Sequence, residues 1–156
     1  MDDIKLLFEA IQLGDKTSVE TQIKSIPNIV NAKDSRGFTP LIFASYFDKK
    51  DCVEVLLKHN ALVDDTDALG NTALIGVSFK GNIDLALLLL ENGANVNAKN
   101  NQGVTPVIFA SMYNQKEMVK LLHSNNADIN MKDNAGKTAL DYAKEKNFDA
   151  IVDCLK

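Results

Sequence analysis

The sequence predicts an all-α solenoid, a stack of helix-turn-helix units joined by short hairpin-like loops. A glycine recurs with a period of 33 residues, at Gly37, Gly70, Gly103 and Gly136. Two residues after each glycine comes a threonine, at Thr39, Thr72, Thr105 and Thr138. Self-similarity at a fixed period of this length is typical of repeat architectures. We therefore expect one repeat domain over residues 1–156.

The first part of each unit predicts a tight turn followed by a short helix. An aspartate or asparagine stands three residues before each glycine and favours a turn, at Asp34, Asp67, Asn100 and Asp133. The pairs Thr39-Pro40 and Thr105-Pro106 match a helix N-cap followed by proline at the first helical position. Small residues four positions further on, Ala44 and Ala110, allow close packing of the helices.

The second part of each unit predicts another helix. After a polar break at Gly81-Asn82, apolar residues follow at helical spacing, for example at Leu85, Ala86 and Leu89. Gly93 is expected to end that helix as a left-handed cap, with Asn60 and Asn126 in the equivalent positions.

These columns together resemble the ankyrin repeat. The segments Gly37-Phe38-Thr39-Pro40-Leu41 and Leu89-Leu90-Glu91-Asn92-Gly93-Ala94 match the family pattern. The resemblance covers the whole chain. It implies an N-terminal capping repeat over 1–33, full repeats over 34–66, 67–99 and 100–132, and a C-terminal capping repeat over 133–156.

The chain departs from the family pattern at two columns. The family's histidine after Thr-Pro-Leu is replaced, so its bonds between neighbouring loops must be replaced or lost; the residues here are Ile42, Ile75, Ile108 and Asp141. The glycine between the two helices survives only as Gly81, and the other positions hold Asp48, Asn114 and Asn147. Asparagine and aspartate tolerate left-handed backbone next best after glycine, so the fold prediction stands.

Composition argues against several classes of partner. The net charge is −4, and Arg36 is the single arginine. The clustered basic face of a nucleic-acid-binding protein is therefore not expected. The longest apolar run, Leu85 to Leu90, is far shorter than the roughly 20 residues of a membrane-spanning helix. The acidic N-terminus does not suggest a secretory signal. We expect a cytoplasmic protein that is monomeric when free.

Three sequence patterns hint at chemistry but fit structural roles better. Ala135-Gly136-Lys137-Thr138 resembles the end of a phosphate-binding loop, which requires a glycine at position 131, where Met131 stands. A calcium loop would need a ligand at position 69, which is Leu69; the carboxylates there are Asp64, Asp65 and Asp67. The only histidines, His59 and His123, lie about two repeats apart. We therefore expect no catalytic residue, metal or cofactor.

Two further residue pairs have competing interpretations. Cys52 and Cys154 lie in apolar helical patterns without metal-ligand spacing, and about three repeats separate them, so reduced thiols without a disulfide are expected. Asn97 and Asn130 occupy a position that is hydroxylated in some eukaryotic ankyrin repeats; an ordinary loop asparagine is the alternative.

The resemblance also implies where a partner would bind. In the family, the variable contacts are the hairpin tips and the exposed side of the first helices, which form a concave face. Aromatic residues, methionine and arginine are enriched in protein interfaces, and five of the ten aromatic residues map to this face. The predicted protein-binding residues are Arg36, Phe38, Tyr46, Phe47, Leu69, Asn71, Phe79, Lys80, Gln102, Val104, Met112 and Tyr113.

Within this set, Tyr46, Phe79 and Tyr113 are expected to be the central contacts, flanked by the hairpin residues Phe38 and Leu69 and by Val104. The alternative is that these side chains pack locally and form no dedicated site. Two functions follow from the resemblance: a general protein-binding module with an unknown protein partner, or a dedicated inhibitor, such as an immunity or antitoxin-like protein, of a specific enzyme or toxin.

Overall fold

The computed structural model describes residues 2–156 and contains, within them, ten α-helices, one 3₁₀ helix and no β-strand. This confirms the predicted all-α fold class. In chain order the helices are α1 (Asp3–Gln12), α2 (Lys16–Ser25), η1 (Pro27–Asn31), α3 (Pro40–Tyr46), α4 (Lys50–Lys58), α5 (Ala73–Lys80), α6 (Ile83–Glu91), α7 (Pro106–Met112), α8 (Lys116–Ser124), α9 (Ala139–Glu145) and α10 (Asp149–Leu155).

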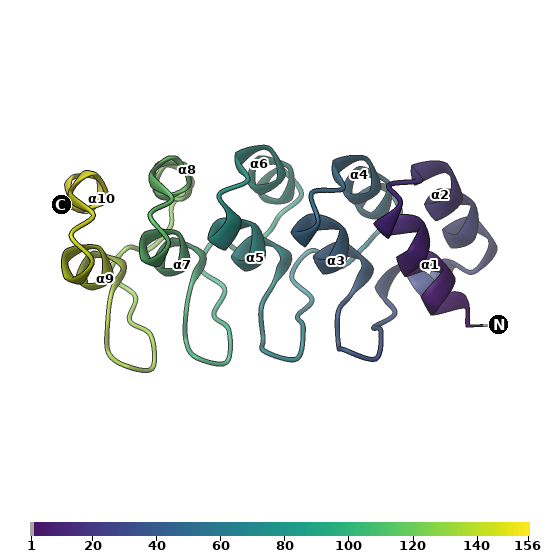
Figure 1. Ribbon diagram of the computed structural model, residues 1–156, viewed down its shortest axis with the longest axis horizontal. Coiled ribbons are helices and arrows are strands. Elements are labelled where there is room, and N and C mark those ends of the chain that lie inside the picture. The colour runs from purple at the N-terminus through teal and green to yellow at the C-terminus, as the bar shows by residue number, and fades with distance from the viewer. Residues whose placement is uncertain (1) are drawn as a thin grey trace.

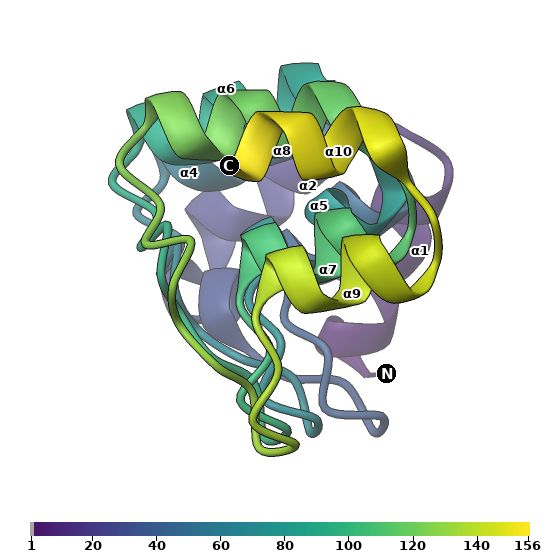
Figure 2. The same cartoon turned by 90° about the vertical axis from the view of Figure 1, so that its left-hand side faces the viewer.

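The α-helices form two layers that run side by side along the stack (Figure 1). We call α1, α3, α5, α7 and α9 the inner layer and α2, α4, α6, α8 and α10 the outer layer. The hairpin loops extend from the inner layer away from the outer layer, as the view along the stack shows (Figure 2). Each predicted repeat contains one helix pair, while the repeat boundaries themselves remain a prediction.

The predicted turn and cap residues act as expected. In the second repeat, Asp67 Oδ1 accepts backbone N–H bonds from Leu69 and Asn71, both at 2.9 Å. Gly70 follows with a positive φ of 79°, which glycine adopts without a steric penalty. Thr72 then caps α5 by accepting the N–H of Ile75 at 3.2 Å. The same cap occurs at the start of the other hairpin-linked inner helices, at Thr39, Thr105 and Thr138.

Backbone and asparagine side-chain hydrogen bonds join neighbouring hairpins. The Asn101 N–H donates to the carbonyl of Leu69, and the Asn134 N–H to that of Gln102, each at 3.0 Å. The side-chain amides of Asn101 and Asn134 add a second bond to the preceding hairpin. At three of the former histidine positions the isoleucine is buried, namely Ile42, Ile75 and Ile108.

A second set of bonds joins successive repeats through the segments that follow the outer helices. The side chain of Asn97 accepts the N–H of Asp128 at 2.8 Å, and that of Asp64 accepts the N–H of Asn95 at 2.9 Å. Asn31 bonds the next repeat in the same way. Asn97 therefore has a structural role, because its side chain helps to hold neighbouring repeats in register.

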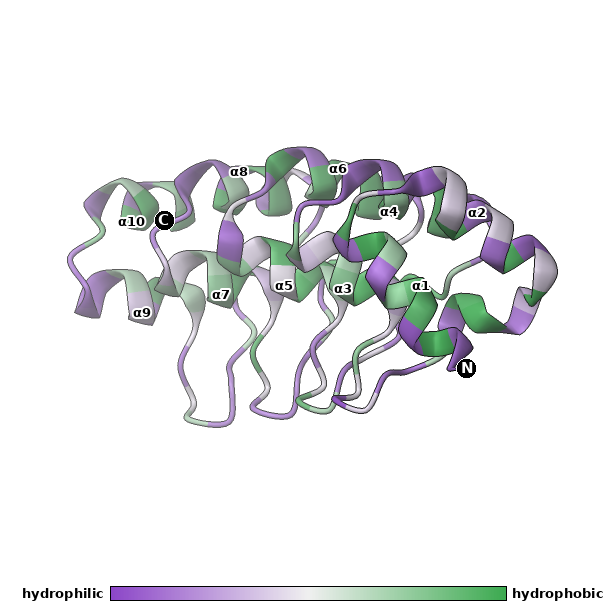
Figure 3. Cartoon of the chain, turned by 45° about the vertical axis from the view of Figure 1, so that its right-hand side comes forward, coloured by the Kyte–Doolittle hydropathy of each residue, from purple (hydrophilic) through white to green (hydrophobic). Residues whose placement is uncertain are grey.

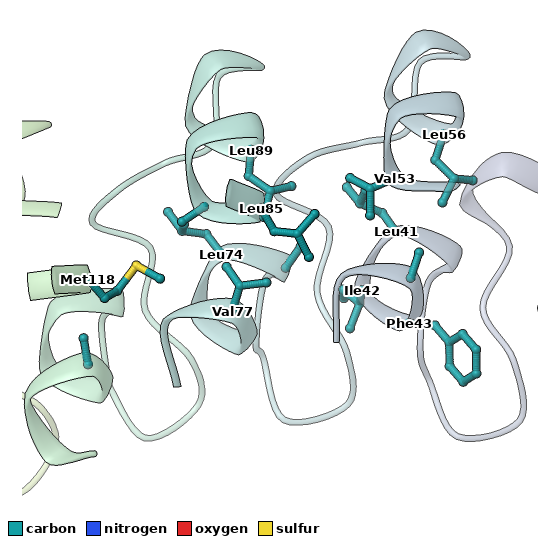
Figure 4. Packing of buried hydrophobic residues seen from close by; sticks show 14 of the residues in the cluster. Leu41, Ile42, Phe43, Val53, Leu56, Leu74, Val77, Leu85, Leu89 and Met118 are labelled. Atoms are coloured by element: carbon teal, nitrogen blue, oxygen red, sulfur yellow. The ribbon is translucent and has the colours of Figure 1, made fainter. Parts of the chain in front are cut away.

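The core lies between the two layers and continues from repeat to repeat. Leu41 and Leu56 fill it in the first full repeat, and Leu74, Leu85 and Leu89 in the second (Figure 4). Each such leucine contributes roughly 1.5–3 kcal/mol by leaving water. The outer helices alternate hydrophobic and hydrophilic residues, as amphipathic helices with one buried face do (Figure 3).

The left-handed positions match the prediction from the glycine column. Gly81 has a φ of 77°, while Asp48, Asn114 and Asn147 hold the equivalent turns at 58°, 58° and 59°. A left-handed conformation costs an ordinary L-residue roughly 1–2 kcal/mol, and less for asparagine.

We predict that Asn114→Ala lowers the free energy of unfolding by about 1 kcal/mol, because alanine adopts the left-handed backbone conformation at this position less readily than asparagine does. Asn114→Gly should be at least as stable as the wild type. Urea denaturation of the three proteins, followed by far-ultraviolet circular dichroism, measures the difference. Equal stability of the alanine and glycine variants would contradict the assigned backbone.

Candidate functional site

An open groove of about 310 Å³ crosses the inner layer at α3, α5 and α7. Its walls are mostly aromatic, and its polar edge comes from the second hairpin, at Asp67, Asn71 and Thr72. The apolar lining consists of Phe38, Ile42, Phe43, Tyr46, Phe47, Leu69, Ala73, Phe79, Phe109 and Tyr113, with Gly76 between them.

The aromatic side chains form two clusters. On the N-terminal side, Phe43 packs against Phe47 with the rings tilted by 50° and their centroids 4.7 Å apart, and Tyr46 meets Phe47 edge-on at 5.3 Å. On the C-terminal side, Phe79 meets Tyr113 edge-on at 4.5 Å, and Phe109 packs against both. We call these the N-terminal and C-terminal aromatic clusters. Such pairs add about 0.5–1.5 kcal/mol each beyond burial, so neighbouring rings help to hold both walls in place.

A glycine separates the two clusters. The positions nine residues after the turn residues are Phe43, Gly76, Phe109 and Tyr142, so three of the four copies carry an aromatic ring. A Cβ added at Gly76 would meet only Tyr46 Cδ2, at 4.0 Å. The missing side chain therefore leaves free space in a column that is otherwise filled.

Cations lie over rings that line the groove, among them those of Phe38 and Tyr46. Arg36 stands 5.0 Å from the ring centre of Phe38, and its guanidinium pairs with Asp34. Lys80 Nζ stands 4.7 Å from the ring of Tyr46 and 3.3 Å from Asp48. These cation–π contacts cover the outer edge of the N-terminal cluster.

The structure brings most of the expected binding residues together. Tyr46, Leu69 and Tyr113 are 43%, 67% and 45% exposed, and Phe47 is also exposed. Arg36, Lys80 and Gln102 are exposed but lie outside the groove lining, as does the half-buried Met112. The remaining groove residues of the expected set are half-buried, namely Phe38, Asn71 and Phe79.

The expectation that Val104 lies on the exposed face is wrong. Its side chain is 4% exposed and belongs to the core cluster. The Val104 N–H closes the hairpin on Asn100, and the next residue, Thr105, caps α7. This position is the base of the hairpin, where a small branched side chain turns inward, whereas the larger ring of Phe38 in the equivalent place reaches the groove.

Sequence reasoning missed three residues that define the groove: Phe43, Gly76 and Phe109. The signal was present in the 33-residue phase, since this column holds an aromatic ring in three repeats and a glycine in one. The small residues Ala44 and Ala110 in the next column predict close packing, but no prediction was made for this column.

The patterns that hinted at chemistry have structural partners instead. Gly136 forms the fourth turn at a φ of 77°, and Thr138 caps α9. Asp64 and Asp67 are each occupied by backbone N–H groups. His59 contacts Glu20 at 2.9 Å, in a different part of the stack from α8, which carries His123. Among residues 2–156, no three His, Cys, Asp or Glu side chains converge as a metal site would require, and none of the helices is long and apolar enough to cross a membrane.

Models of known families match this chain over most of its length. A model of ankyrin repeats in three copies matches residues 7–100, and one of ankyrin repeats in many copies matches residues 81–143. The chain is an ankyrin-repeat protein. Repeats of this family are generally protein–protein interaction modules and are typically non-catalytic. The groove of this ankyrin-repeat protein is accordingly a candidate interaction site.

The hydrogen bond between Tyr142 on α9 and Asp133 in the fourth hairpin makes the free energy of unfolding depend on pH. The Tyr142 hydroxyl donates to Asp133 Oδ2, which raises the pKa of Tyr142 to about 12. Burial alone would raise the pKa of Asp133, but hydrogen bonds from Tyr142 and from the backbone of Lys137 and Ala135 outweigh it and lower the pKa below the usual 3.8.

We predict that Tyr142→Phe lowers the free energy of unfolding at pH 7 by about 1 kcal/mol, the typical value of a hydrogen bond. A carboxyl whose pKa is depressed by folding stabilises the fold above its unfolded pKa, and this contribution is lost as the pH falls through the folded pKa. The difference between the two proteins should therefore narrow below about pH 4. Urea denaturation at pH 7 and pH 3 tests this, and a difference that stays constant between them would contradict it.

Proposed function

We propose that this ankyrin-repeat protein is a non-catalytic module that binds one protein partner across the groove between α3, α5 and α7. The observation that carries the proposal is an open groove between two aromatic clusters, in which Tyr46, Phe47 and Tyr113 are exposed. Exposed apolar patches rimmed by polar residues commonly mark interaction sites. Rigid aromatic residues are also the commonest anchors of binding energy.

The groove presents a mainly apolar surface, with the carboxylate of Asp67 at its polar edge. Residues 100–113, which supply the C-terminal wall and its hairpin, include no charged residue. At the N-terminal wall, Arg36 and Lys80 are paired with Asp34 and Asp48. Apart from the Asp67 carboxylate, which lines the groove, and Lys146, whose Nζ lies 5.6 Å from the ring centre of Tyr113, little charge has to be desolvated when a partner covers the groove.

The proposal also covers the oligomeric state and the cellular compartment of the protein. We infer a monomer in the cytoplasm, in which residues 1–33 and 133–156 act as capping repeats for the three full repeats. Both cysteines are free, and burial raises the pKa of the Cys52 thiol, which suits a reducing compartment.

We predict that the triple variant Tyr46→Ala, Phe79→Ala, Tyr113→Ala loses partner affinity by about thirtyfold or more, because truncating even one central aromatic anchor often costs about 2 kcal/mol. The partner is first isolated by affinity capture from the source cell and identified by mass spectrometry. Its affinity for each variant is then measured by calorimetry. The stability of the variant should fall by less than the roughly 3–5 kcal/mol of one fully buried phenylalanine.

A matched control replaces three exposed leucines that do not line the groove, Leu13, Leu62 and Leu87, by alanine. This variant should bind the partner as the wild type does. Undiminished binding by the aromatic variant, or equal loss in both variants, would reject the groove as the site. If the captured partner is an enzyme or toxin and binding abolishes its activity, the module is a dedicated inhibitor.

A further inference from the structure

The fourth hairpin shows how this fold fills the column that is empty at Gly76. There, Tyr142 stands nine residues after the turn residue Asp133 and donates its hydroxyl to Asp133 Oδ2. In the second repeat the same two positions are Gly76 and Asp67. The groove is thus the place that a tyrosine occupies two repeats later in the same chain.

The second carboxylate oxygen of Asp67 has a weaker hydrogen-bond donor than its counterparts at Asp34 and Asp133. One oxygen accepts the two backbone N–H groups of its turn, as in the other repeats. In the first repeat the second oxygen, Asp34 Oδ2, receives the Arg36 guanidinium at 2.6 Å. The second oxygen of Asp67 has only the side-chain amide of Asn71, at 3.5 Å. Asp67 is half-buried and lines the groove, so it offers a free acceptor there.

We propose that the groove receives a tyrosine side chain of the partner, with its ring above Gly76 between the two aromatic clusters and its hydroxyl donating to Asp67. This inference rests on the proposed partner binding and names the group that occupies the site. Edge-on and offset packing against aromatic walls suits an inserted ring. The phenol hydroxyl supplies the hydrogen bond that Tyr142 supplies in the fourth repeat.

Two alternatives fit the groove less well. A purely apolar side chain would cover the free oxygen of Asp67 without a donor, which is costly for a buried acceptor. A guanidinium would satisfy Asp67, but Arg36 already stands 5.4 Å from the ring centre of the groove residue Phe43, and Lys80 lies over Tyr46. Both cations are paired with carboxylates, so their repulsion is reduced, and the main advantage of a tyrosine is that its ring fills the Gly76 column as rings do in the other three repeats.

The test uses small probes and the full chain labelled with ¹⁵N. In titrations followed by nuclear magnetic resonance, 4-methylphenol should shift the amide signals of Leu69, Asn71 and Gly76 in a saturable way. The matched ether 4-methylanisole, which has no donor, should bind about fivefold more weakly, the usual effect of one lost hydrogen bond. Benzylguanidine, which carries a cation, should also bind more weakly than 4-methylphenol.

Asp67→Asn removes the carboxylate and keeps a residue that forms the same turn at Asn100. This variant should bind 4-methylphenol and 4-methylanisole equally. Gly76→Ala, which narrows the groove without changing its polar edge, should weaken both probes. Equal affinity of the two probes for the wild type, tighter binding of benzylguanidine, or a phenol preference that survives in Asp67→Asn would each overturn the proposal.

The outcomes separate this inference from the proposed function. If the triple aromatic variant loses the partner but the wild type shows no phenol preference, the groove binds a partner through another side chain. If the phenol preference is found but the triple variant keeps its partner, the groove is a phenol site and the protein partner binds elsewhere.

Discussion

The two helices of a single repeat are too short to be stable on their own, and the rest of the structure depends on how that constraint is met. The inner helices α3, α7 and α9 have seven residues each, well below the length at which isolated helices persist in water. Their stability comes from neighbouring repeats that bury each other's apolar faces. Residues that hold neighbours in register are therefore as important as the core itself. Here these are the hairpin asparagines Asn101 and Asn134, and the residues Asn31, Asp64 and Asn97 that bond the next repeat.

The groove is lined in part by aromatic residues that are not required to fill the core. Leucine, valine and alanine already fill the space between the two layers. The rings of Tyr46 and Tyr113 are consequently free to lie at the surface, held by neighbouring rings rather than by burial. Glycine in one copy of a column that elsewhere carries rings then turns a continuous aromatic surface into a groove. One missing side chain thereby supplies the cavity and leaves Asp67 Oδ2 with only a 3.5 Å bond from the Asn71 side-chain amide.

The fold could be predicted from sequence because its determinants are local and repeated. A turn aspartate, a capping threonine and a left-handed residue act within a few positions of themselves, and each was visible in the 33-residue phase. The exposed ends of the inner helices were also predictable, as Tyr46 and Tyr113 show. The side chain of Val104 was misplaced because the direction of a hairpin residue depends on its size and on the neighbouring hairpin. The groove itself depends on contacts between three repeats, which no single column reveals.

The central claim is that the gap at Gly76 is the binding site, and filling the gap from within tests it most directly. Gly76→Tyr restores the ring that the fourth repeat carries, and the backbone has room for its Cβ. The account predicts a melting temperature above that of the wild type, from the added packing, and loss of the captured partner in calorimetry. A variant that is well folded and stabilised but still binds the partner with wild-type affinity would contradict the account.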